Sequence, residues 1–144
     1  MVPLEIPKRI VLDTTALVNH LRAKGGPSTV TRLEGRVELA TTIVNLFELF
    51  LGAFKYGEAK TNLTAVKGLS STLRILSFTE EASELAAKIL SGLEKAGRAI
   101  EIRDLFVGAT ALQEGYAVAT ENKEHFQRIP GLTILSEQEL LRRL

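Results

Sequence analysis

The sequence predicts an α/β fold in which a mostly parallel sheet of five strands is covered by helices on both faces, giving three layers. Short apolar runs alternate with longer segments of helical periodicity along the chain, and this alternation is typical of a parallel sheet buried between helices. The chain has 144 residues, of which 45% are hydrophobic and 24% charged, as in an average soluble protein with a sizeable core. We therefore expect residues 1–144 to form one domain.

The first unit is a strand followed by a helix. Residues 9–12 form a short apolar run after Pro7, which predicts a buried strand ending at Asp13. Over residues 14–24 the apolar side chains are spaced as in a helix, and the Gly-Gly-Pro sequence at 25–27 ends it. Asp13 therefore stands in the turn between the strand and the helix.

The middle of the chain continues this alternation. Thr41 and Thr42 are N-cap candidates for an apolar helix, and Gly57 separates that helix from the next. The elements expected here are a strand at 37–40, a helix ending near residue 55, a helix at about 58–71 and a strand at 73–78.

The last part of the chain repeats the pattern. Thr79 opens a long helix that ends at Gly97, and Ser136 with Glu139 forms a capping box for the final helix. The elements expected between them are a helix at 102–114, a strand at 116–119, one helical turn at 123–127 and a strand at 132–135.

Composition excludes several classes of site. The 18 Lys and Arg side chains nearly balance the 17 Asp and Glu, so the net charge is +1 and any nucleic acid must be held by local geometry. The sequence contains no Cys, which excludes disulfides, thiolate zinc sites and a Cys nucleophile. The N-terminal residues lack the pattern of a signal peptide, and no apolar stretch reaches the ~18 residues of a membrane span. We expect a cytoplasmic protein without membrane association.

Aspartate is rare in this chain, because Asp13 and Asp104 are its two Asp residues among 17 acidic side chains. Asp13 follows the first predicted strand, at the edge where ligands collect in doubly wound sheets. An Asp in that position is also well placed to cap the following helix. By itself, Asp13 leaves both interpretations open.

Glu48 is the single charged residue in the apolar window 43–54. An unpaired carboxylate is costly to bury, so we expect Glu48 to meet a cation, a metal ion or a solvent-filled cleft. The alternative is a position at the rim of an interface helix, and we favour the functional interpretation.

Asp104 lies among apolar residues in the segment IRDLFVGATAL, and Gly108 removes bulk from the same helical face one turn later. The alternative is a first-turn Asp stabilised by the helix dipole and paired with Arg103. Three carboxylates in such settings, with no soft ligand in the chain, predict one oxygen-lined site for Mg²⁺ or Mn²⁺. The chemistry of such a site is phosphodiester hydrolysis.

The loop after the fourth strand offers a further contribution. Thr120 could orient a water molecule, and Asn122 could offer its oxygen to the metal. We interpret four other polar residues as solvated, surface or packing residues instead: Glu121, Glu124, His20 and His125. Several basic residues near the strand ends could contact phosphate, although each alone is better explained as surface charge. They are Arg22, Lys24, Arg32, Arg36, Lys123 and Arg128.

At these residues the sequence resembles the PIN-domain nucleases, and among them the VapC toxins of VapBC toxin–antitoxin pairs. The matching segments, in family order and spanning nearly the whole chain, are IVLDTTALV, TTIVNLFELFLGA, IRDLFVGATAL and YAVATENKEHFQRIPGL. Each segment is short and degenerate, whereas four in order are fairly specific.

The resemblance implies a sheet of strand order 3-2-1-4-5 and a Mg²⁺- or Mn²⁺-dependent endoribonuclease. It gives metal-binding roles to Asp13, Glu48 and Asp104, and it makes Thr14 or Thr15 the hydroxyl after the first Asp. Asn122 stands at or near the place where many relatives carry Asp. The resemblance also implies an RNA substrate, a homodimer and a small antitoxin that contacts the apolar segment 46–54. The alternative is a PIN-like module that binds RNA or protein without cutting.

Overall fold

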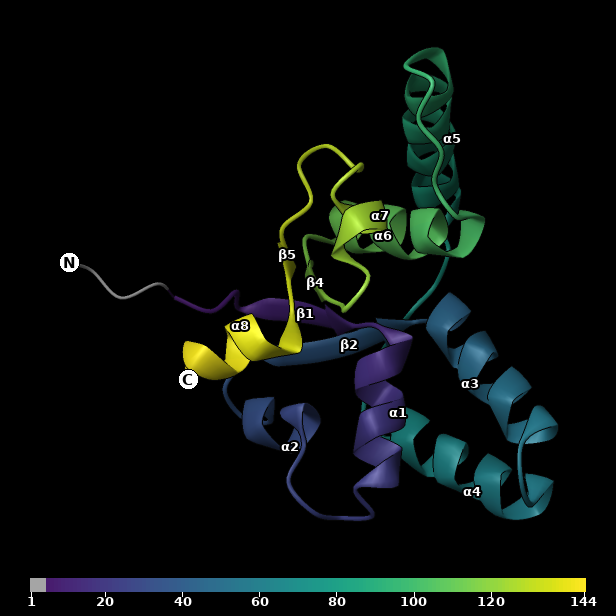
Figure 1. The fold of residues 1–144 in the computed structure, drawn as a ribbon, viewed down its shortest axis with the longest axis vertical. Coiled ribbons are helices and arrows are strands. Elements are labelled where there is room, and N and C mark those ends of the chain that lie inside the picture. Colours follow the sequence, from purple (N-terminus) through teal and green to yellow (C-terminus); the bar gives the residue numbers. More distant parts are fainter. Residues whose placement is uncertain (1–4) are drawn as a thin grey trace.

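The computed structural model describes residues 5–144, in which strands and helices alternate (Figure 1). The elements are β1 (Arg9–Leu12), α1 (Thr14–Arg22), α2 (Thr29–Leu33), β2 (Glu38–Thr42), α3 (Ile43–Lys55), α4 (Ala59–Ser70), β3 (Arg74–Leu76), α5 (Glu80–Lys95), α6 (Ile102–Glu114), β4 (Ala117–Ala119), α7 (Lys123–Phe126), β5 (Ile134–Leu135) and α8 (Glu137–Arg142). The strands form a parallel sheet in the order β3-β2-β1-β4-β5. The α/β class and the strand order are confirmed.

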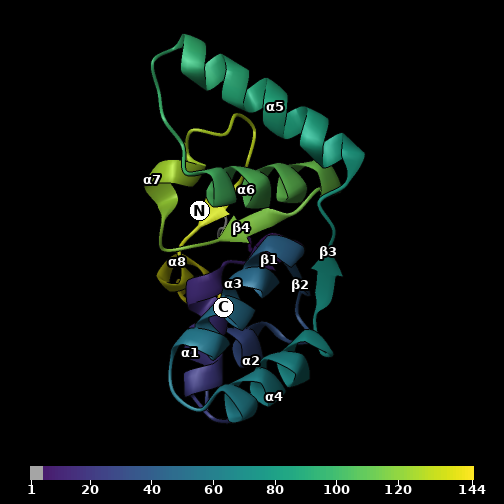
Figure 2. The same ribbon diagram turned by 90° about the vertical axis from the view of Figure 1, so that its right-hand side faces the viewer.

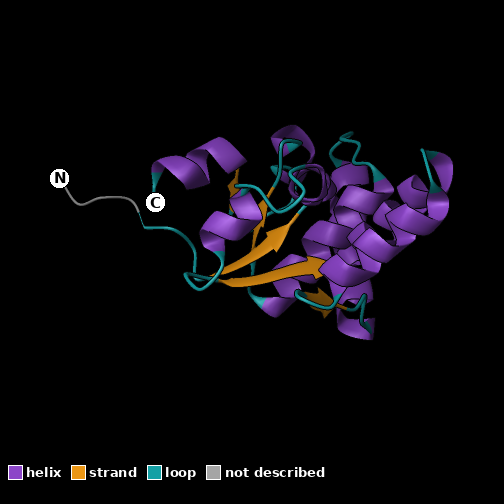
Figure 3. Ribbon diagram, turned by 90° about the horizontal axis from the view of Figure 1, so that it is seen from below, coloured by secondary structure: helices purple, strands orange, loops and turns teal. Residues whose placement is uncertain are grey.

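Helices cover both faces of the sheet, which makes the three layers seen in Figures 1 and 2. On one face α5 and α6 pack over Val11 and Val118, together with Phe126 of α7. On the other, α1 to α4 and α8 cover Ile10 and Leu12, because successive strand residues point to opposite faces. Figure 3 shows the strands running between helices. Within residues 5–144, no helix is both long and apolar enough to cross a membrane.

Most element boundaries lie within a few residues of their expected positions. α1 ends at Arg22 because Lys24 (φ 48°) and Gly25 (φ 86°) have left-handed backbone. The edge strands are shorter than expected because a strand extends only as far as its partner pairs with it. The observed bounds are Glu38–Thr42 for 37–40, Ala59–Ser70 for 58–71, Arg74–Leu76 for 73–78, Glu80–Lys95 for 79–97, Ala117–Ala119 for 116–119, Lys123–Phe126 for 123–127 and Ile134–Leu135 for 132–135.

Helix α2, which lies between α1 and β2, was not predicted from the sequence. The Oγ of Ser28 accepts from the Thr31 N–H (3.2 Å), and the Ser28 N–H donates to the Thr31 Oγ1 (2.9 Å). Val30 and Leu33 anchor the helix in the core. Five residues are too few to show helical periodicity, so this reciprocal cap was the available signal.

Thr42, Thr79 and Ser136 are confirmed as N-caps, whereas Thr41 is not a cap, because its Oγ1 donates to the Leu12 carbonyl (2.7 Å). The side chains of Thr42, Thr79 and Ser136 each accept a hydrogen bond from the backbone N–H three residues further on. Thr42 matters most for function, because it fixes the start of α3 at the carboxyl end of β2.

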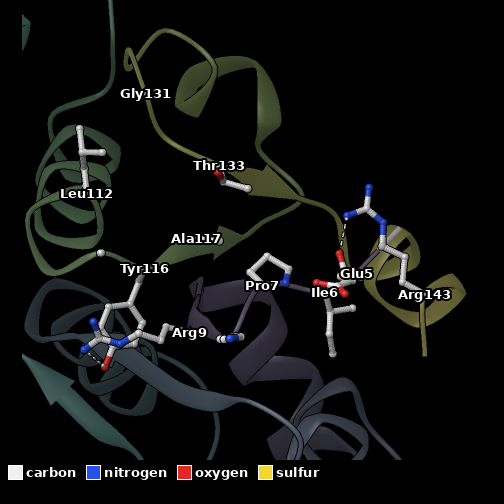
Figure 4. Close-up of a pocket in the computed structure, with 12 residues that line it drawn as sticks. Glu5, Ile6, Pro7, Arg9, Leu112, Tyr116, Ala117, Gly131, Thr133 and Arg143 are labelled. Carbon is white, nitrogen blue, oxygen red and sulfur yellow. Dashed lines mark hydrogen bonds between the residues drawn. The ribbon is translucent and has the colours of Figure 1, made fainter. Parts of the chain in front are cut away.

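The amino ends of the central strands carry an ion-pair network. The Arg9 guanidinium lies 4.3 Å from the ring centre of Tyr116 and 3.0 Å from Glu38. Hydrogen bonds from Tyr116 and Arg74 lower the pKa of Glu38. A cavity of about 630 Å³ lies beside this network, between the segment before β1, the end of α6 and Arg143 (Figure 4). This network and cavity are at the opposite end of the sheet from the strand carboxyl ends.

Candidate active site

The carboxyl ends of β1 and β4 bring Asp13 and Thr120 together. The Asp13 N–H donates to the Ala119 carbonyl (3.0 Å), which continues the pairing of the two strands. Its Oδ1 accepts from the Asn45 Nδ2 (2.9 Å), and its Oδ2 accepts from the Thr120 Oγ1 (2.6 Å). Although Asp13 precedes α1, its carboxylate makes no cap bond to the described backbone. Asp13 therefore occupies the N-cap position of α1 without the side-chain hydrogen bond that the capping interpretation requires.

Asn45 is a candidate site residue that was not predicted from the sequence. It lies in the first turn of α3 and is fully buried. Its Oδ1 accepts from the Thr42 Oγ1 (2.7 Å) and N–H (3.3 Å), while its Nδ2 donates to Asp13 and to the Thr14 Oγ1 (3.0 Å). The available signal was a polar, uncharged residue three positions after a predicted Thr cap, in an otherwise apolar run.

Glu48 reaches the same edge from the next turn of α3. Its Oε1 accepts from the Thr14 Oγ1 (3.3 Å), and its Oε2 lies 3.6 Å from the Arg103 Nη1. Burial, and then the nearby charge of Asp13, raise the pKa of Glu48. Glu48 was expected to meet a cation, a metal ion or a solvent-filled cleft, and it meets the Arg103 guanidinium. Of the two candidate hydroxyls, that of Thr14 is hydrogen-bonded to Glu48 and Asn45, whereas Thr15 is exposed.

Asp104 lies in the first turn of α6, and its side chain is 17% exposed. Its Oδ2 accepts from the Asn122 Nδ2 (2.6 Å) and lies 3.5 Å from the His125 Nδ1. Burial, followed by the charges of Asp13 and Glu101, raises the pKa of Asp104 to about 6. Asp104 is therefore held close to other carboxylates at an energetic cost.

The surroundings of Asp104 differ from expectation in two ways. Arg103 does not supply its ion pair: among the described residues, the guanidinium contacts Glu48 and Glu101. Gly108 does not open space beside the carboxylate either. A Cβ on Gly108 would clash with the Ile129 side chain, so the glycine instead allows α6 to pack against the segment after α7.

The loop after β4 contributes unequally. Thr120 is buried, and its Oγ1 accepts from the Asn122 N–H (2.9 Å). His125 was expected to be a surface or packing residue, but it lies against Asp104, and its Nδ1 accepts from the Glu101 N–H (3.2 Å). The residues that point elsewhere, as expected, are Glu121 toward the Glu137 N–H, Glu124 toward Arg128, and His20 toward Ser28.

The charge and donor type of the cluster fit a hard divalent ion. Asp13, Glu48 and Asp104 could supply oxygen ligands, and burial, followed by the nearby carboxylate charges, raises the pKa of Glu48 and of Asp104. Over residues 5–144, however, no three Asp, Glu or His side chains stand close enough to share an ion as they are placed. Ion binding therefore requires these carboxylates to move closer together and Glu48 and Asp104 to release their present partners, Arg103 and Asn122.

A model of the PIN domain family matches residues 10–132, a range that includes all three carboxylates and Thr120. The chain belongs to the PIN domain family. The resemblance found in the sequence is confirmed, and so is the sheet order that it implied.

This PIN domain is similar to VapC proteins. It is 32% identical over 91 residues to the tRNA(fMet)-specific endonuclease VapC of Salmonella typhimurium, covering 63% of this chain and 69% of the relative. It is 28% identical over 121 residues to ribonuclease VapC1 of Methanocaldococcus jannaschii, covering 84% and 81%. The solved structure of DNA-bound VapBC from Salmonella typhimurium superposes with a TM-score of 0.79 at 26% identity, covering 91% and 99%.

Proposed function

We propose that this PIN-domain protein is an endoribonuclease that hydrolyses RNA phosphodiester bonds with Mg²⁺ or Mn²⁺, and that it is the toxin of a toxin–antitoxin pair. The observation that carries the proposal is the convergence of Asp13, Glu48 and Asp104 at one sheet edge, each with a polar partner. An enzyme of the nuclease class is consistent with the names of its curated relatives, which are endonucleases or ribonucleases.

The residues that would hold the ion are Asp13, Glu48 and Asp104, with the oxygen of Asn122 as a fourth ligand. A bound divalent ion would supply an activated water and charge stabilisation at the phosphate. Asn122 now presents its amide nitrogen to Asp104, so this role requires the amide to turn.

The remaining polar residues keep Asp13 ready for this role. Asn45 and Thr120 each hold one oxygen of its carboxylate, which leaves little rotational freedom to lose when the ion binds. The hydroxyl proton of Thr120 points to Asp13, so we assign Thr120 to positioning this ligand. Thr14 does the same for Glu48.

The deciding experiment is cleavage of RNA with Mg²⁺ or Mn²⁺, with EDTA as the metal-free control. We expect Asp13→Asn and Asp104→Asn to lower the cleavage rate by at least about a hundredfold, since each removes a ligand charge. Both variants must retain the thermal unfolding behaviour of a folded protein. Cleavage by both variants at the wild-type rate would sink the proposal. RNA binding without cleavage by the wild type would favour a PIN-like binding module instead.

Changing either Asp to Glu keeps the charge and tests the geometry. We expect Asp13→Glu and Asp104→Glu to weaken Mn²⁺ binding by about tenfold or more, because the longer side chain cannot keep the same contacts and ligand position. Isothermal titration calorimetry measures this effect, and Glu84→Asp on the exposed face of α5 is the control. Unchanged affinity in both variants would mean that the placement of the two Asp residues is coincidental.

The protein partners of this domain are also proposals. Two similar solved structures are of VapBC, and VapBC is a family of toxin–antitoxin systems, which supports a small antitoxin partner here. Exposed apolar side chains of α3 extend toward its C-terminal end, with Phe47 55% and Phe54 66% exposed, and we propose that the antitoxin or a second copy of this chain covers them. We further propose that the protein acts in the cytoplasm.

A further inference from the structure

Arg103 is a cation that contacts the acidic cluster through Glu48. It precedes Asp104 in the first turn of α6, and its guanidinium reaches across to α3. Nη1 lies 3.6 Å from the Glu48 Oε2, and Nε lies 3.7 Å from the Glu101 Oε1. Both distances exceed those of a good charge-assisted hydrogen bond, and the side chain is 49% exposed. The contact is therefore loose and can be exchanged.

Other basic side chains near the cluster are engaged elsewhere. Lys123 pairs with Glu139, and Arg128 pairs with Glu124 and donates to the Ala99 carbonyl. Within residues 5–144, Arg103 is the Lys or Arg whose ion pair includes one of the three cluster carboxylates. Among the described residues, Arg103 is therefore the basic side chain that supplies a positive charge at Glu48.

The charges of the site give this arginine two successive partners. Three ionised carboxylates with Arg103 carry two negative charges, which equals the charge that one divalent ion neutralises. Without Arg103, the same site with one ion bound keeps a negative charge and repels a phosphodiester. Once an ion takes Glu48, the guanidinium loses its carboxylate, and it lies at the edge of the site where a phosphate oxygen would be its natural replacement.

We propose that Arg103 is an exchangeable counter-ion: it occupies Glu48 in the metal-free protein, yields Glu48 to the divalent ion, and then contacts the RNA phosphate. This inference rests on the proposed metal-dependent nuclease function and adds a residue outside the acidic set. It predicts opposite effects of one substitution on metal binding and on substrate binding, which a purely structural role would not produce.

The test compares Arg103→Gln with Arg74→Gln. Arg74 is a matched control, because it is also an exposed arginine paired with a glutamate, but it lies on β3 at the other end of the sheet. Mn²⁺ affinity is measured by calorimetry at low ionic strength, and KM is measured for an RNA oligonucleotide at saturating Mn²⁺. For Arg103→Gln we expect Mn²⁺ binding to be about fivefold tighter or more, and KM to rise about fivefold or more. Arg103→Lys keeps the charge and should change Mn²⁺ affinity little.

The possible outcomes separate this inference from the proposed function. If the wild type binds no Mn²⁺, both fall together. If it binds Mn²⁺ and Arg103→Gln has the same Mn²⁺ affinity and KM as Arg74→Gln, Arg103 is an ordinary surface charge and the inference alone is overturned. Weaker Mn²⁺ binding by Arg103→Gln also overturns it, since Arg103 would then be positioning Glu48 for the ion rather than competing with it.

Discussion

Replacing Asn45 by Ala is expected to lower the free energy of unfolding by about 3 kcal/mol and to reduce cleavage strongly. The amide is fully buried and joins Thr42, Asp13 and Thr14. Its loss leaves buried donors and acceptors without partners, which costs about 1–3 kcal/mol for each group, and it also leaves a cavity. Urea unfolding in EDTA measures the effect on stability without any contribution from metal.

Two further variants identify the cause. Asn45→Asp keeps the side-chain volume but replaces the donor to Asp13 with a carboxylate oxygen. A loss as large as that of Asn45→Ala would assign the effect to the lost donor and the added negative charge rather than to the cavity. Asn62→Ala removes an exposed amide that donates to the Tyr56 carbonyl, and we expect less than about 1 kcal/mol from it. Equal losses for Asn45→Ala and Asn62→Ala would contradict a central role for Asn45.

In the absence of metal, Asp104→Asn is expected to stabilise the protein at pH 7 by about 2 kcal/mol. The pKa of Asp104 is raised from its ordinary value of 3.8 to about 6 by burial and by the charges of Asp13, Glu101 and Glu48, opposed by His125. A carboxyl with a raised pKa contributes stability that is fully present below pH 4 and is lost as the pH rises through 6. The favourable helix-dipole effect on a first-turn carboxylate is smaller, at about 0.3–1 kcal/mol.

The measurement is the difference in unfolding free energy between wild type and Asp104→Asn across pH 4 to 7 in EDTA. The advantage of the Asn variant should be small at pH 4 and grow toward pH 7. Added Mn²⁺ should then stabilise the wild type more than the variant. A variant that is less stable than wild type at every pH would mean that Asp104 serves the fold and not a site.

Local patterns were sufficient to predict the layers of the fold. Apolar runs such as 10–12 are buried strand residues, and the Thr42, Thr79 and Ser136 caps depend on residues only three positions apart. Helix α2 was not predicted because its five residues are too few to show helical periodicity. Strand β3 was predicted too long because its length is set by pairing with β2, which is not a local property.

Site residues could be predicted where a carboxylate stands in an apolar stretch of the sequence. They could not be predicted where an ordinary polar residue gains its role through tertiary contacts. Glu48 and Asp104 stand out because charges in apolar segments need a reason. Asn45 is uncharged, and its importance depends on a contact with another element: its Nδ2 lies 2.9 Å from the Oδ1 of Asp13, which follows β1. His125 and Arg103 look like ordinary polar residues in the sequence, and only the packing of α3, α6 and α7 gives them their partners.

The hydrogen bond between Thr120 and Asp13 joins residues 107 positions apart. Strand β1 lies at the centre of the sheet, and until β4 has been synthesised one of its edges has no partner. The proposed nuclease centre therefore cannot exist in a nascent chain that has not yet reached Thr120. A protein built this way stays harmless to RNA through most of its own translation, and it acquires the proposed activity only when the late-made strand closes against the first.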